Sequence, residues 1–584
     1  MLQTLLPQSF APVGFPLAAS LVVAVILVTG CGTEPADLVL RNGTIVTVDD
    51  DQPEAEALAV RGDQIAAVGS DADIESYVGP DTRVIDLDGQ LAVPGFIEGH
   101  GHFMGLGEAQ MQLDLMTTNA WSEIVAQVDS AAAAMDAGTW IEGRGWHQEK
   151  WSSDPARVVD GFPTNRRLNE VAPNHPVFLT HASGHASIAN DAALERAGIG
   201  PDTPDPSGGT IVRDARGRAT GVLLETAEGL VHDAIQESRA EMDATERDDL
   251  ERQKVRLAAE ESLSKGVTSF QDQGASFETI ERYREMAESG DLGIRMYALV
   301  SQSEVTPENR ERLADIRAVG AADQHFTARS VGEVTVDGAL GSRSAWMLEP
   351  YADAPDDTGI NVTSMERVRE IAEISMEEDY QVAVHAIGDR ANRETLDLFA
   401  SLFEETEDDS ESLRWRVEHA QHLHPDDIPR FADMGVIPSM QAMHACSDAP
   451  YNVARLGAER VQEGAYVWKT LWEDGAVVTN GTDAPVEDVD PLASYHCTVT
   501  REVPGTDTTF TPDEALSRER ALKSYTLNNA HAAFEEDIKG SLTPGKLADI
   551  AVLSNDILTV PADEILNTDI VHTIVGGEVV YSRD

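Results

Sequence analysis

Cysteine is scarce in this chain, with three among 584 residues, at Cys31, Cys446 and Cys497. If Cys31 is modified, as the sequence around it indicates, only two remain, and these are far apart in motif terms. So few cysteines give no readable disulfide framework and no zinc site of the cysteine type. Any metal ion in this protein must therefore be held by histidine and carboxylate side chains.

Basic residues are also few. Lysine and arginine together number 43 against 102 acidic residues, the net charge is −59, and only seven residues are lysine. This balance excludes a general affinity for nucleic acid, which requires a basic face. An acidic surface keeps a protein soluble and would suit a salty environment, although a bias in composition explains the same charge. A series of salt concentrations distinguishes the two explanations.

The apolar run near the N-terminus, residues 16–29, is too short for a comfortable membrane span. It fits the apolar region of a signal peptide, and the small residues before Cys31 resemble a bacterial lipobox. We expect residues 1–30 to be a signal peptide of the lipoprotein type and Cys31 to carry lipid. The protein would then be exported and anchored on the periplasmic or cell-surface side of a membrane. No lysine or arginine precedes Arg41, so an uncleaved anchor and a misassigned start codon stay open.

Both ends of the mature chain have the pattern of short β-strands. Asn42-Gly43 and Asp88-Gly89 are turn signals between strand-like runs, and Gly576-Gly577 has the same position near the other end. Neither end is long enough for a robust sheet alone. The economical interpretation is one small β-sandwich, formed by residues 36–93 together with residues 538–584.

Residues 94–537 alternate strand-like apolar runs, such as Val267 to Phe270, with helical stretches, such as residues 244–264. This alternation predicts an α/β fold with a parallel sheet and right-handed crossovers. The length suits a (β/α)₈ TIM barrel with insertions. The stretch of about 105–235 is long for one βα unit, and we expect it to be an insertion that covers the barrel mouth.

The sharpest chemical signal is a histidine pair at the end of a short apolar strand, in the sequence VPGFIEGHGH at residues 93–102. His100 and His102 are spaced i and i+2, which in a strand places both side chains on one face. At the carboxyl end of a barrel strand that face looks into the active site. Two neutral imidazoles placed in this way can chelate one divalent ion.

Three later apolar runs also end in residues that bind metals, at His385, at His419 and at Asp483. A single histidine at a strand end is more simply explained as a hydrogen-bonded structural residue. Four such endings in barrel order, counting the first pair, are hard to obtain by chance. Together they predict one metal site at the mouth of the barrel.

A wider set of motifs extends along the chain. They are Pro94-Gly95-Phe96-Ile97 with the first histidine pair; Gly145-Trp146; Ser183-Gly184-His185; Gly208-Gly209 through Gly221 and Glu225; Asp337-Gly338 through Gly341-Ser342-Arg343; His385-Ala386-Ile387-Gly388-Asp389; Glu418-His419-Ala420; Asp483; and Gly540 through Gly545-Lys546-Leu547-Ala548-Asp549. With these motifs the chain resembles the amidohydrolase superfamily, and within it amidohydrolase family 3, which includes YtcJ-like proteins and N-substituted formamide deformylases. The resemblance covers nearly the whole mature chain.

The resemblance implies a role for each matching position. His100 and His102 would bind the more buried metal, and His385 and His419 would bind a second metal or complete a single site. Asp483 would contact the metal and act as the base for the attacking water. The implied cofactor is a divalent metal, with Zn²⁺ preferred, as one ion or two.

Glu333 departs from the family pattern. Many relatives have a lysine at this position, four residues before Asp337, and its carboxylation makes a bridging ligand. Glutamate also supplies a carboxylate, on a shorter arm. Glu333 would therefore bridge two metals, leave a one-metal site, or be a structural acid at a strand end. Metal analysis of the purified protein separates these possibilities.

The substrate side of the site is expected to include three residues in family-like motifs or strand-end loops, namely His185, Arg343 and His444. They could orient a carbonyl or a carboxylate by hydrogen bonding. Trp146, Trp151 and Trp346 could line an apolar pocket, although buried aromatic residues more often belong to a core. His422 and His424 are expected on a solvated loop.

Taken together, the sequence predicts hydrolysis of a non-peptide C–N bond in an amide, an N-substituted formamide or a cyclic amide by a metal-activated water. One alternative is a deaminase or a lactone-type hydrolase on the same scaffold, since a fold does not fix a substrate. The other is a catalytically silent surface lipoprotein that binds a ligand. The expected partners are a small amide-type substrate, the membrane through the lipid at Cys31, no nucleic acid, and a second copy of the chain in a homodimer.

Overall fold

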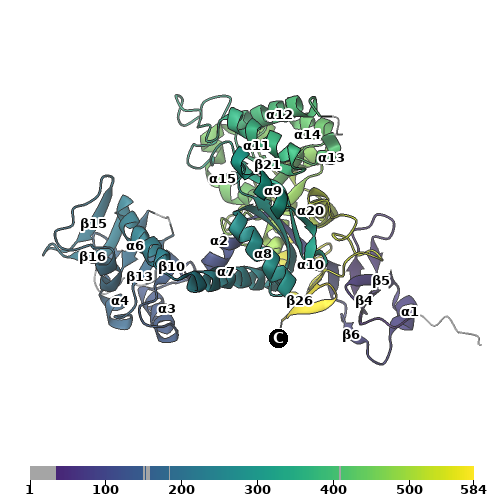
Figure 1. The fold of residues 1–584 in the computed structure, drawn as a ribbon, viewed down its shortest axis with the longest axis horizontal. Coiled ribbons are helices and arrows are strands. Elements are labelled where there is room, and N and C mark those ends of the chain that lie inside the picture. The colour runs from purple at the N-terminus through teal and green to yellow at the C-terminus, as the bar shows by residue number, and fades with distance from the viewer. Residues whose placement is uncertain are drawn as a thin grey trace, which may run out of the picture.

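The computed structural model describes residues 34–583 apart from 149–150, 153–154, 156–157, 183–184 and 407–409. The predicted signal peptide and the lipid site at Cys31 lie outside the described residues. Figure 1 shows a barrel at the centre, a β-rich unit on one side of it and an inserted α/β unit on the other. None of the helices in the described part is both long and apolar enough to cross a bilayer.

The β-rich unit contains two sheets. The larger has the strand order β27-β26-β25-β7-β2-β3, and the smaller has the order β5-β4-β1-β6. The strands of the larger sheet are β2 (Thr44–Val46), β3 (Glu54–Ala55), β7 (Leu91–Pro94), β25 (Ile550–Leu553), β26 (Ile570–Val575) and β27 (Glu578–Ser582). Those of the smaller sheet are β1 (Leu38–Arg41), β4 (Ala57–Arg61), β5 (Gln64–Gly69) and β6 (Arg83–Asp86).

The two ends of the chain meet where β25 pairs antiparallel with β7. Apolar side chains from both ends share one buried cluster, which includes Leu58 and Ile45 from the first part and Ile550 and Ile574 from the last. Because neither end has enough apolar surface to bury alone, each supplies the cover that the other needs.

The central unit is a nearly closed barrel of eight parallel strands, which confirms the predicted α/β TIM-barrel fold. The strands are β8 (Phe96–Gly101), β17 (Val267–Ala275), β18 (Arg295–Val300), β20 (Phe326–Thr335), β21 (Gln381–Ala386), β22 (Arg416–His419), β23 (Ile437–Gln441) and β24 (Thr479–Gly481). Their neighbours pair in parallel throughout this order. In a barrel of this kind the carboxyl ends of the strands form the mouth.

The first and last strands approach each other at a seam. A parallel bridge joins Gly101 to Ala484, and the buried carboxylate of Glu98 accepts hydrogen bonds from the backbone N–H and the hydroxyl of Thr482, at 2.7 and 3.0 Å. This seam places the end of β8, with its histidine pair, beside the loop that follows β24.

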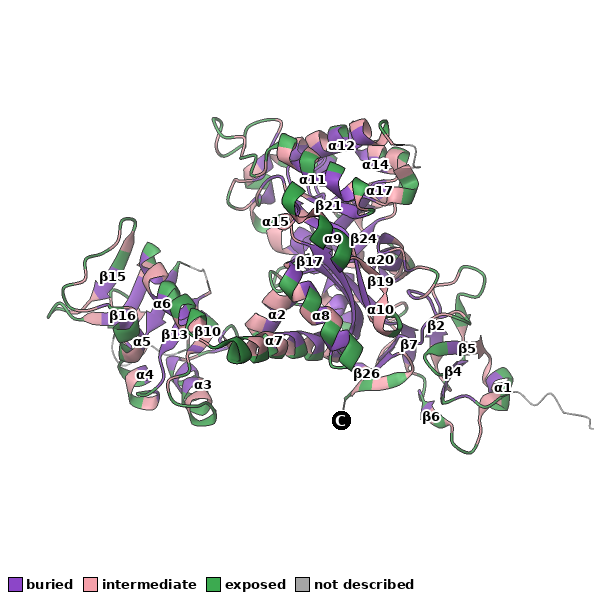
Figure 2. Ribbon diagram, in the orientation of Figure 1, coloured by how far each residue is buried: buried purple, intermediate pink, exposed green. Residues whose placement is uncertain are grey.

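Helices surround the barrel. The principal ones are α7 (Ala244–Ser264), α8 (Phe277–Ser289), α9 (Arg310–Ile316), α11 (Met365–Glu377), α12 (Asp389–Phe403), α14 (Ile428–Met434), α15 (Ala442–Leu456), α17 (Trp468–Glu473), α18 (Pro491–Thr500), α19 (Arg518–Ser524) and α20 (Leu527–Ala532). In α11, Ser364 caps the first turn by accepting from the N–H of Arg367, and the buried residues Val368, Ile371 and Ala372 form the apolar face. Figure 2 shows such buried faces turned toward the strands.

The insertion is an α/β unit with its own sheet, of strand order β15-β16-β14-β13-β10-β9. Its strands are β9 (Leu113–Asp114), β10 (Ile141–Trp146), β13 (Val177–His181), β14 (Ala186–Ala189), β15 (Gly209–Arg213) and β16 (Ala219–Glu225). Its helices are α3 (Trp121–Ala134), α4 (Arg166–Val171), α5 (Asp191–Arg196) and α6 (Gly229–Ala240).

The insertion does not lie against the mouth, where the sequence analysis places it. Figure 1 shows it standing away from the barrel. Two buried apolar clusters of its own, one around Trp146 and one around Ile211, explain why it folds as a separate unit.

The joint between the insertion and the barrel is formed by α2 (Phe103–Gln110) and α7, which pack against each other. Arg239, near the end of α6, bonds Glu108 of α2 and Glu142 of β10, at 2.7 and 2.9 Å. A Cβ atom at Gly107 would lie 2.0 Å from the carbonyl oxygen of Lys254, so only glycine permits this close approach of the two helices.

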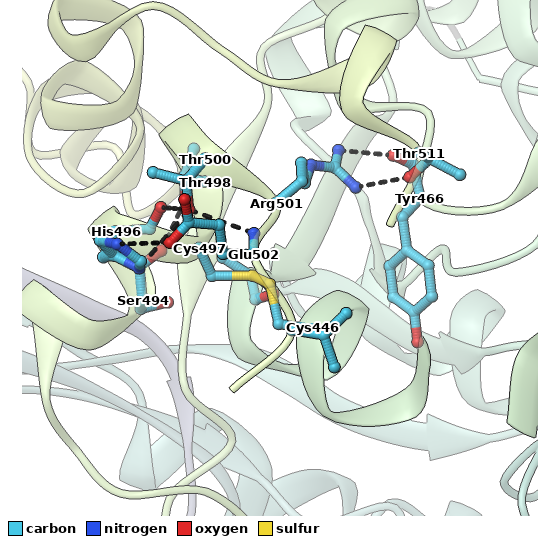
Figure 3. The surroundings of a disulfide bond; sticks show 12 residues. Cys446, Tyr466, Ser494, His496, Cys497, Thr498, Thr500, Arg501, Glu502 and Thr511 are labelled. Atoms are coloured by element: carbon cyan, nitrogen blue, oxygen red, sulfur yellow. Dashed lines mark hydrogen bonds and ion pairs between the residues drawn. A yellow bond between two sulfur atoms is a disulfide. The ribbon is translucent and has the colours of Figure 1, made fainter. Parts of the chain in front are cut away.

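Cys446 of α15 and Cys497 of α18 form a disulfide (Figure 3). The reading of the sequence as free of a disulfide framework is wrong for this pair. The two cysteines are 51 residues apart and share no motif, and they meet only because α15 and α18 follow neighbouring barrel strands.

Candidate metal centre

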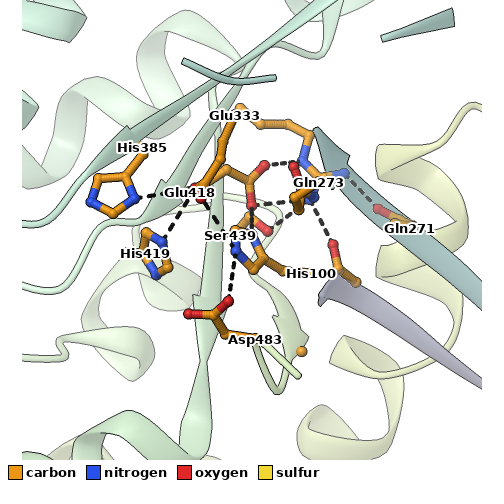
Figure 4. Close-up of polar contacts among 12 residues, drawn as sticks. His100, Gln271, Gln273, Glu333, His385, Glu418, His419, Ser439 and Asp483 are labelled. Atoms are coloured by element: carbon orange, nitrogen blue, oxygen red, sulfur yellow. Dashed lines mark hydrogen bonds and ion pairs between the residues drawn. The ribbon is translucent and has the colours of Figure 1, made fainter. Parts of the chain in front are cut away.

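The structure brings all six predicted ligands together at the mouth of the barrel. Figure 4 labels all of them except His102. They form three overlapping groups of potential ligand atoms, in which the atoms of each group lie within 4.8 Å of one another; the groups are His100, His102 and Glu333; His100, His419 and Asp483; and Glu333, His385 and His419. Each ligand stands at or next to the carboxyl end of a barrel strand, which is why residues distant in sequence converge.

Glu333 lies at the centre of the cluster. Its Oε2 atom is 3.2 Å from Nδ1 of His385 and 3.3 Å from Nε2 of His419. Its Oε1 atom is 3.9 Å from Nε2 of His102, and Oε2 is also 3.9 Å from Nε2 of His100. One carboxylate therefore lies among all four histidines, with Oε2 nearest His385 and His419 and Oε1 facing His102.

Asp483 contacts the first histidine pair. Its Oδ1 atom lies 3.1 Å from Nε2 of His102 and 3.5 Å from Nε2 of His100. Burial alone would raise the pKa of this carboxyl, but the two imidazoles hold the pKa well below its ordinary value. Asp483 is therefore an ionised acceptor at neutral pH.

Hydrogen bonds on the far side of three imidazoles fix their tautomers. Nδ1 of His100 donates to Oε2 of Glu418 at 2.6 Å, Nδ1 of His102 donates to the carbonyl oxygen of Gln273 at 3.0 Å, and Nδ1 of His419 donates to Oε1 of Gln441 at 2.7 Å. These partners accept only, so the proton of each neutral imidazole is on Nδ1, and Nε2 is the atom that would offer its lone pair to a bound metal. Metal-binding histidines are held in this way by outer hydrogen bonds.

Burial and neighbouring charges set the protonation of these groups. Burial, together with the adjacent His385, lowers the pKa of His419 to about 4. For Glu333, burial would raise the pKa, yet the surrounding histidines hold it well below the ordinary value. The cluster thus combines carboxylates with at least one neutral imidazole, the donor set that divalent ions such as Zn²⁺ accept.

Buried polar atoms in the cluster fit a bound cation. Among the described residues, Nε2 of His100 and Oδ1 of Asp483 are buried and make no hydrogen bond. Leaving such atoms without a partner costs free energy. A divalent ion between them would satisfy both, so the residues present fit the metal that the fold implies.

Two residues that the sequence analysis gave no separate role support this arrangement. Glu418 and Arg416 of β22 are fully buried, and Nε of Arg416 lies 2.6 Å from Oε1 of Glu418. The ion pair, with the proton of His100, holds the pKa of Glu418 below its ordinary value although burial opposes it. The signal available in the sequence was a charged pair, Arg416 and Glu418, inside an apolar strand. That signal does not reveal His100, which bonds Glu418 from 318 residues away.

Of the three predicted substrate residues, the structure places only His444 at the cluster. Its Nε2 atom is 3.8 Å from Oδ2 of Asp483. Its Nδ1 atom accepts from the amide of Gln421 at 3.1 Å, so the ring proton is on Nε2 and is turned toward the site. This is a position from which a neutral imidazole can donate to a substrate oxygen.

The other two predicted substrate residues lie elsewhere. His185 pairs with Glu225 at 3.1 Å on the exposed side of the insertion. Both nitrogens of the Arg343 fork bond Asp353, at 3.0 and 2.9 Å. Neither residue is brought to the metal cluster. A match to a family motif does not show where the side chain of the matching residue points.

The three tryptophans that could line an apolar pocket make their contacts elsewhere, two in the insertion and one with an arginine. Trp146 is fully buried in the apolar cluster of the insertion, and Trp151 packs against that cluster. Trp346 is half-buried beneath the guanidinium of Arg390, 4.4 Å from its ring centre.

The expected solvated loop after β22 is wrong for His422, which is 3 % exposed and packs edge-on against Tyr466. The chain turns inward here, because the N–H of His422 bonds the carbonyl of Ile387 at 3.0 Å. Burial lowers the pKa of His422 to about 3. The side chain of His424 is 39 % exposed.

Comparison with known proteins agrees with this geometry. The chain is 30% identical to the putative amidohydrolase YtcJ of Bacillus subtilis over 93% of this chain and 99% of that protein. It is 27% identical to the N-substituted formamide deformylase of Arthrobacter pascens over 94% and 99%. Among solved structures, an uncharacterized metal-dependent hydrolase from Pyrococcus furiosus is similar with a TM-score of 0.68 and 27% identity, over 89% of this chain and all of that one.

The sequence model of the amidohydrolase family matches residues 83–581, which include the barrel, the insertion and the part of the sandwich from β6 onward. The six clustered ligands lie within the matched range. The chain therefore belongs to the amidohydrolase family and is a hydrolase that acts on carbon–nitrogen bonds.

Proposed function

We propose that this protein hydrolyses a non-peptide C–N bond in a small amide, an N-substituted formamide or a cyclic amide. The observation that carries the proposal is the convergence of four histidines, Glu333 and an ionised Asp483 on one point at the barrel mouth. The similarity to a protein named N-substituted formamide deformylase supports the substrate class.

We further propose that the cofactor is Zn²⁺ and that two ions bind, with Glu333 as the bridging ligand. The support is that this one carboxylate lies within 3.9 Å of all four histidines, with Oε2 toward His385 and His419 and Oε1 toward His102. A divalent ion here would supply Lewis acidity, which lowers the pKa of water and polarises a carbonyl group. Two equivalents of metal are expected by elemental analysis, and one equivalent at full activity would contradict the bridging role.

The side chains have distinct parts in the reaction. The carboxylate of Asp483 accepts the proton of the attacking water and then delivers it to the leaving nitrogen. Nε2–H of His444 donates to the carbonyl oxygen as negative charge develops there. Glu418 holds His100 in the tautomer and orientation that the site requires.

The test is a substrate panel with a matched pair of variants. Zinc-loaded protein is assayed with an N-alkyl formamide, a cyclic amide, a purine amine and a lactone. Asp483→Asn should reduce turnover of the amide substrates by about 10²–10⁴-fold. The control Asp353→Asn, which changes an aspartate outside the cluster, should not reduce it. Turnover of the purine or the lactone alone would favour the alternatives, and no dependence on Asp483 would favour a silent binding protein.

We also propose that the protein is an exported lipoprotein, anchored through Cys31, and a homodimer. The disulfide supports export, since disulfides persist in oxidising compartments. Mass spectrometry of the mature N-terminus and sedimentation in detergent test these proposals. An intact Met1 would contradict the first, and a monomer at micromolar concentration the second.

A further inference from the structure

We propose that the Cys446–Cys497 disulfide is a positioning crosslink for one half of the metal centre, so that the affinity for metal depends on the oxidation state of this pair. The inference rests on the metal site proposed above. It goes beyond that site because neither cysteine is a ligand. Both are buried, Cys446 completely and Cys497 with 2 % exposure, and they join α15 to α18 (Figure 3).

The first turn of α15 carries residues that face the site. Gln441, which accepts from the ring of His419, immediately precedes the helix, and His444 lies in its first turn. Pro450 stands inside this helix. Proline has no N–H, so the carbonyl of Cys446, four residues earlier, loses its helical hydrogen bond. The backbone ladder is therefore weakest at the residue where the disulfide attaches.

The helix α18 provides a firm support for that attachment. At its start the carboxylate of Asp490 caps the N–H groups of Leu492 and Ala493. At its end the buried guanidinium of Arg501 donates to the carbonyls of Tyr466 and Glu514, both at 2.8 Å, as Figure 3 shows for Tyr466. Because α18 is fixed at both ends, the disulfide can hold α15 in a nearly constant position relative to it.

A third element joins the same frame. Asn480 of β24 donates to the hydroxyl of Thr498 in α18 at 3.0 Å and accepts from the N–H of Ala442 in α15 at 3.1 Å. Three residues later the chain reaches Asp483, whose φ of 60° is in the left-handed region. Such a conformation persists only where the surroundings hold it. The frame of α15, β24 and α18 therefore positions Asp483 and His444 together.

The other half of the centre has supports outside this frame, although the seam contact from the N–H of Asp483 to the carbonyl oxygen of His100, at 2.8 Å, joins His100 to it directly. His100 and His385 lie within barrel strands, and Glu418 with Arg416 anchors the former from below. Loss of the disulfide should thus loosen Asp483 and His444 while leaving the fold of the barrel intact. The consequence is a site that still binds metal, but more weakly and with altered geometry at Asp483.

The experiment compares the oxidised protein with Cys446→Ala/Cys497→Ala, using Co²⁺ and Zn²⁺ as probes. Zinc affinity is measured by competition with a chromophoric chelator, and the visible spectrum of bound Co²⁺ reports its coordination. We expect the double variant to bind Zn²⁺ about 10-fold or more weakly, with a changed Co²⁺ spectrum. Reduction of the unaltered protein with a phosphine, continued until a thiol count shows that the buried disulfide is open, should reproduce both effects, which covers the case of a variant that does not fold.

The matched control is Leu58→Ala, a cavity in the sandwich far from the site. Its melting temperature should fall, yet its zinc affinity and Co²⁺ spectrum should stay those of the unaltered protein. Equal affinity and spectra in the oxidised and disulfide-free proteins would overturn the inference, as would an equal loss in Leu58→Ala or free thiols in air-oxidised protein. An unaltered protein without zinc affinity would instead refute the proposed function.

Discussion

Glu418 provides the sharpest test of how the barrel interior supports the metal centre. Its carboxylate is fully buried, lies 2.6 Å from Nδ1 of His100 and pairs with the buried Arg416. In Glu418→Gln the guanidinium keeps its charge but loses its counter-charge. Removal of one partner of a buried ion pair costs about 3–5 kcal/mol. Glutamine has one acceptor oxygen and cannot serve both Arg416 and His100. Loss of an outer hydrogen bond to a histidine that would hold the metal weakens metal binding about 10–100-fold.

The matched control is Glu98→Gln, on the other side of His100. Glu98 is also fully buried, but its carboxyl has no cationic partner of the arginine type, and burial raises its pKa to about 7. At pH 6 it is therefore largely protonated, and in glutamine the amide oxygen can accept from the N–H of Thr482 while the NH₂ group donates to its hydroxyl. We expect this change to cost about 1 kcal/mol or less.

The free energy of unfolding of each variant is measured in urea at pH 6, after EDTA has removed any metal. The zinc affinity of each folded variant is measured separately, by competition with a chelator. Unfolding without metal separates the stability of the ion pair from the stabilisation that metal binding adds. The reasoning fails if Glu418→Gln and Glu98→Gln have equal midpoints and equal zinc affinities.

Three further predictions follow from buried and exposed charges. The folded pKa of His422, about 3, is below its unfolded value of 6.5, so the unfolded chain binds the proton first and the free energy of unfolding falls as pH falls through this window. Relative to His422→Phe, the unaltered protein should lose about 4 kcal/mol between pH 6.5 and 3 in urea titrations, and parallel curves would contradict this. Arg295 of the barrel and Asp549 of the sandwich form a buried ion pair with two hydrogen bonds. Arg295→Ala should therefore lower the free energy of unfolding by about 3–5 kcal/mol in chemical unfolding, whereas a loss under 1 kcal/mol would show that water reaches the pair. Arg343→Ala, which breaks only a partly exposed pair with Asp353, should leave zinc affinity and KM unchanged, and a large rise in KM would restore its predicted contact with substrate.

Much of the site could be read from short segments, because strand geometry is local. The alternation of side chains along a strand puts His100 and His102 on one face, and the mouth of a parallel barrel collects whatever ends each strand. These two rules predict that Asp483, 381 positions after His102, lies at the same point. The prediction does not require the angles between strands.

What the sequence hides is contact across the barrel. Glu418 stands next to a predicted ligand, yet its partner is His100 on another strand. His422 follows a motif that ends in polar residues, but a single backbone bond to Ile387 turns it inward. The pairing of Cys446 with Cys497 depends on which helices are neighbours, a property of the closed barrel and of no segment in it.

The close contact of α2 with α7 has a consequence for how this chain can change. At Gly107 the two helices nearly touch, so the chain departs from the barrel and returns to it at almost the same place. Everything between them has its own apolar cores and its own sheet. The segment is thus a cassette: a short linker between the two helices would close the gap, and evolution or design can exchange this unit without a new solution for the barrel.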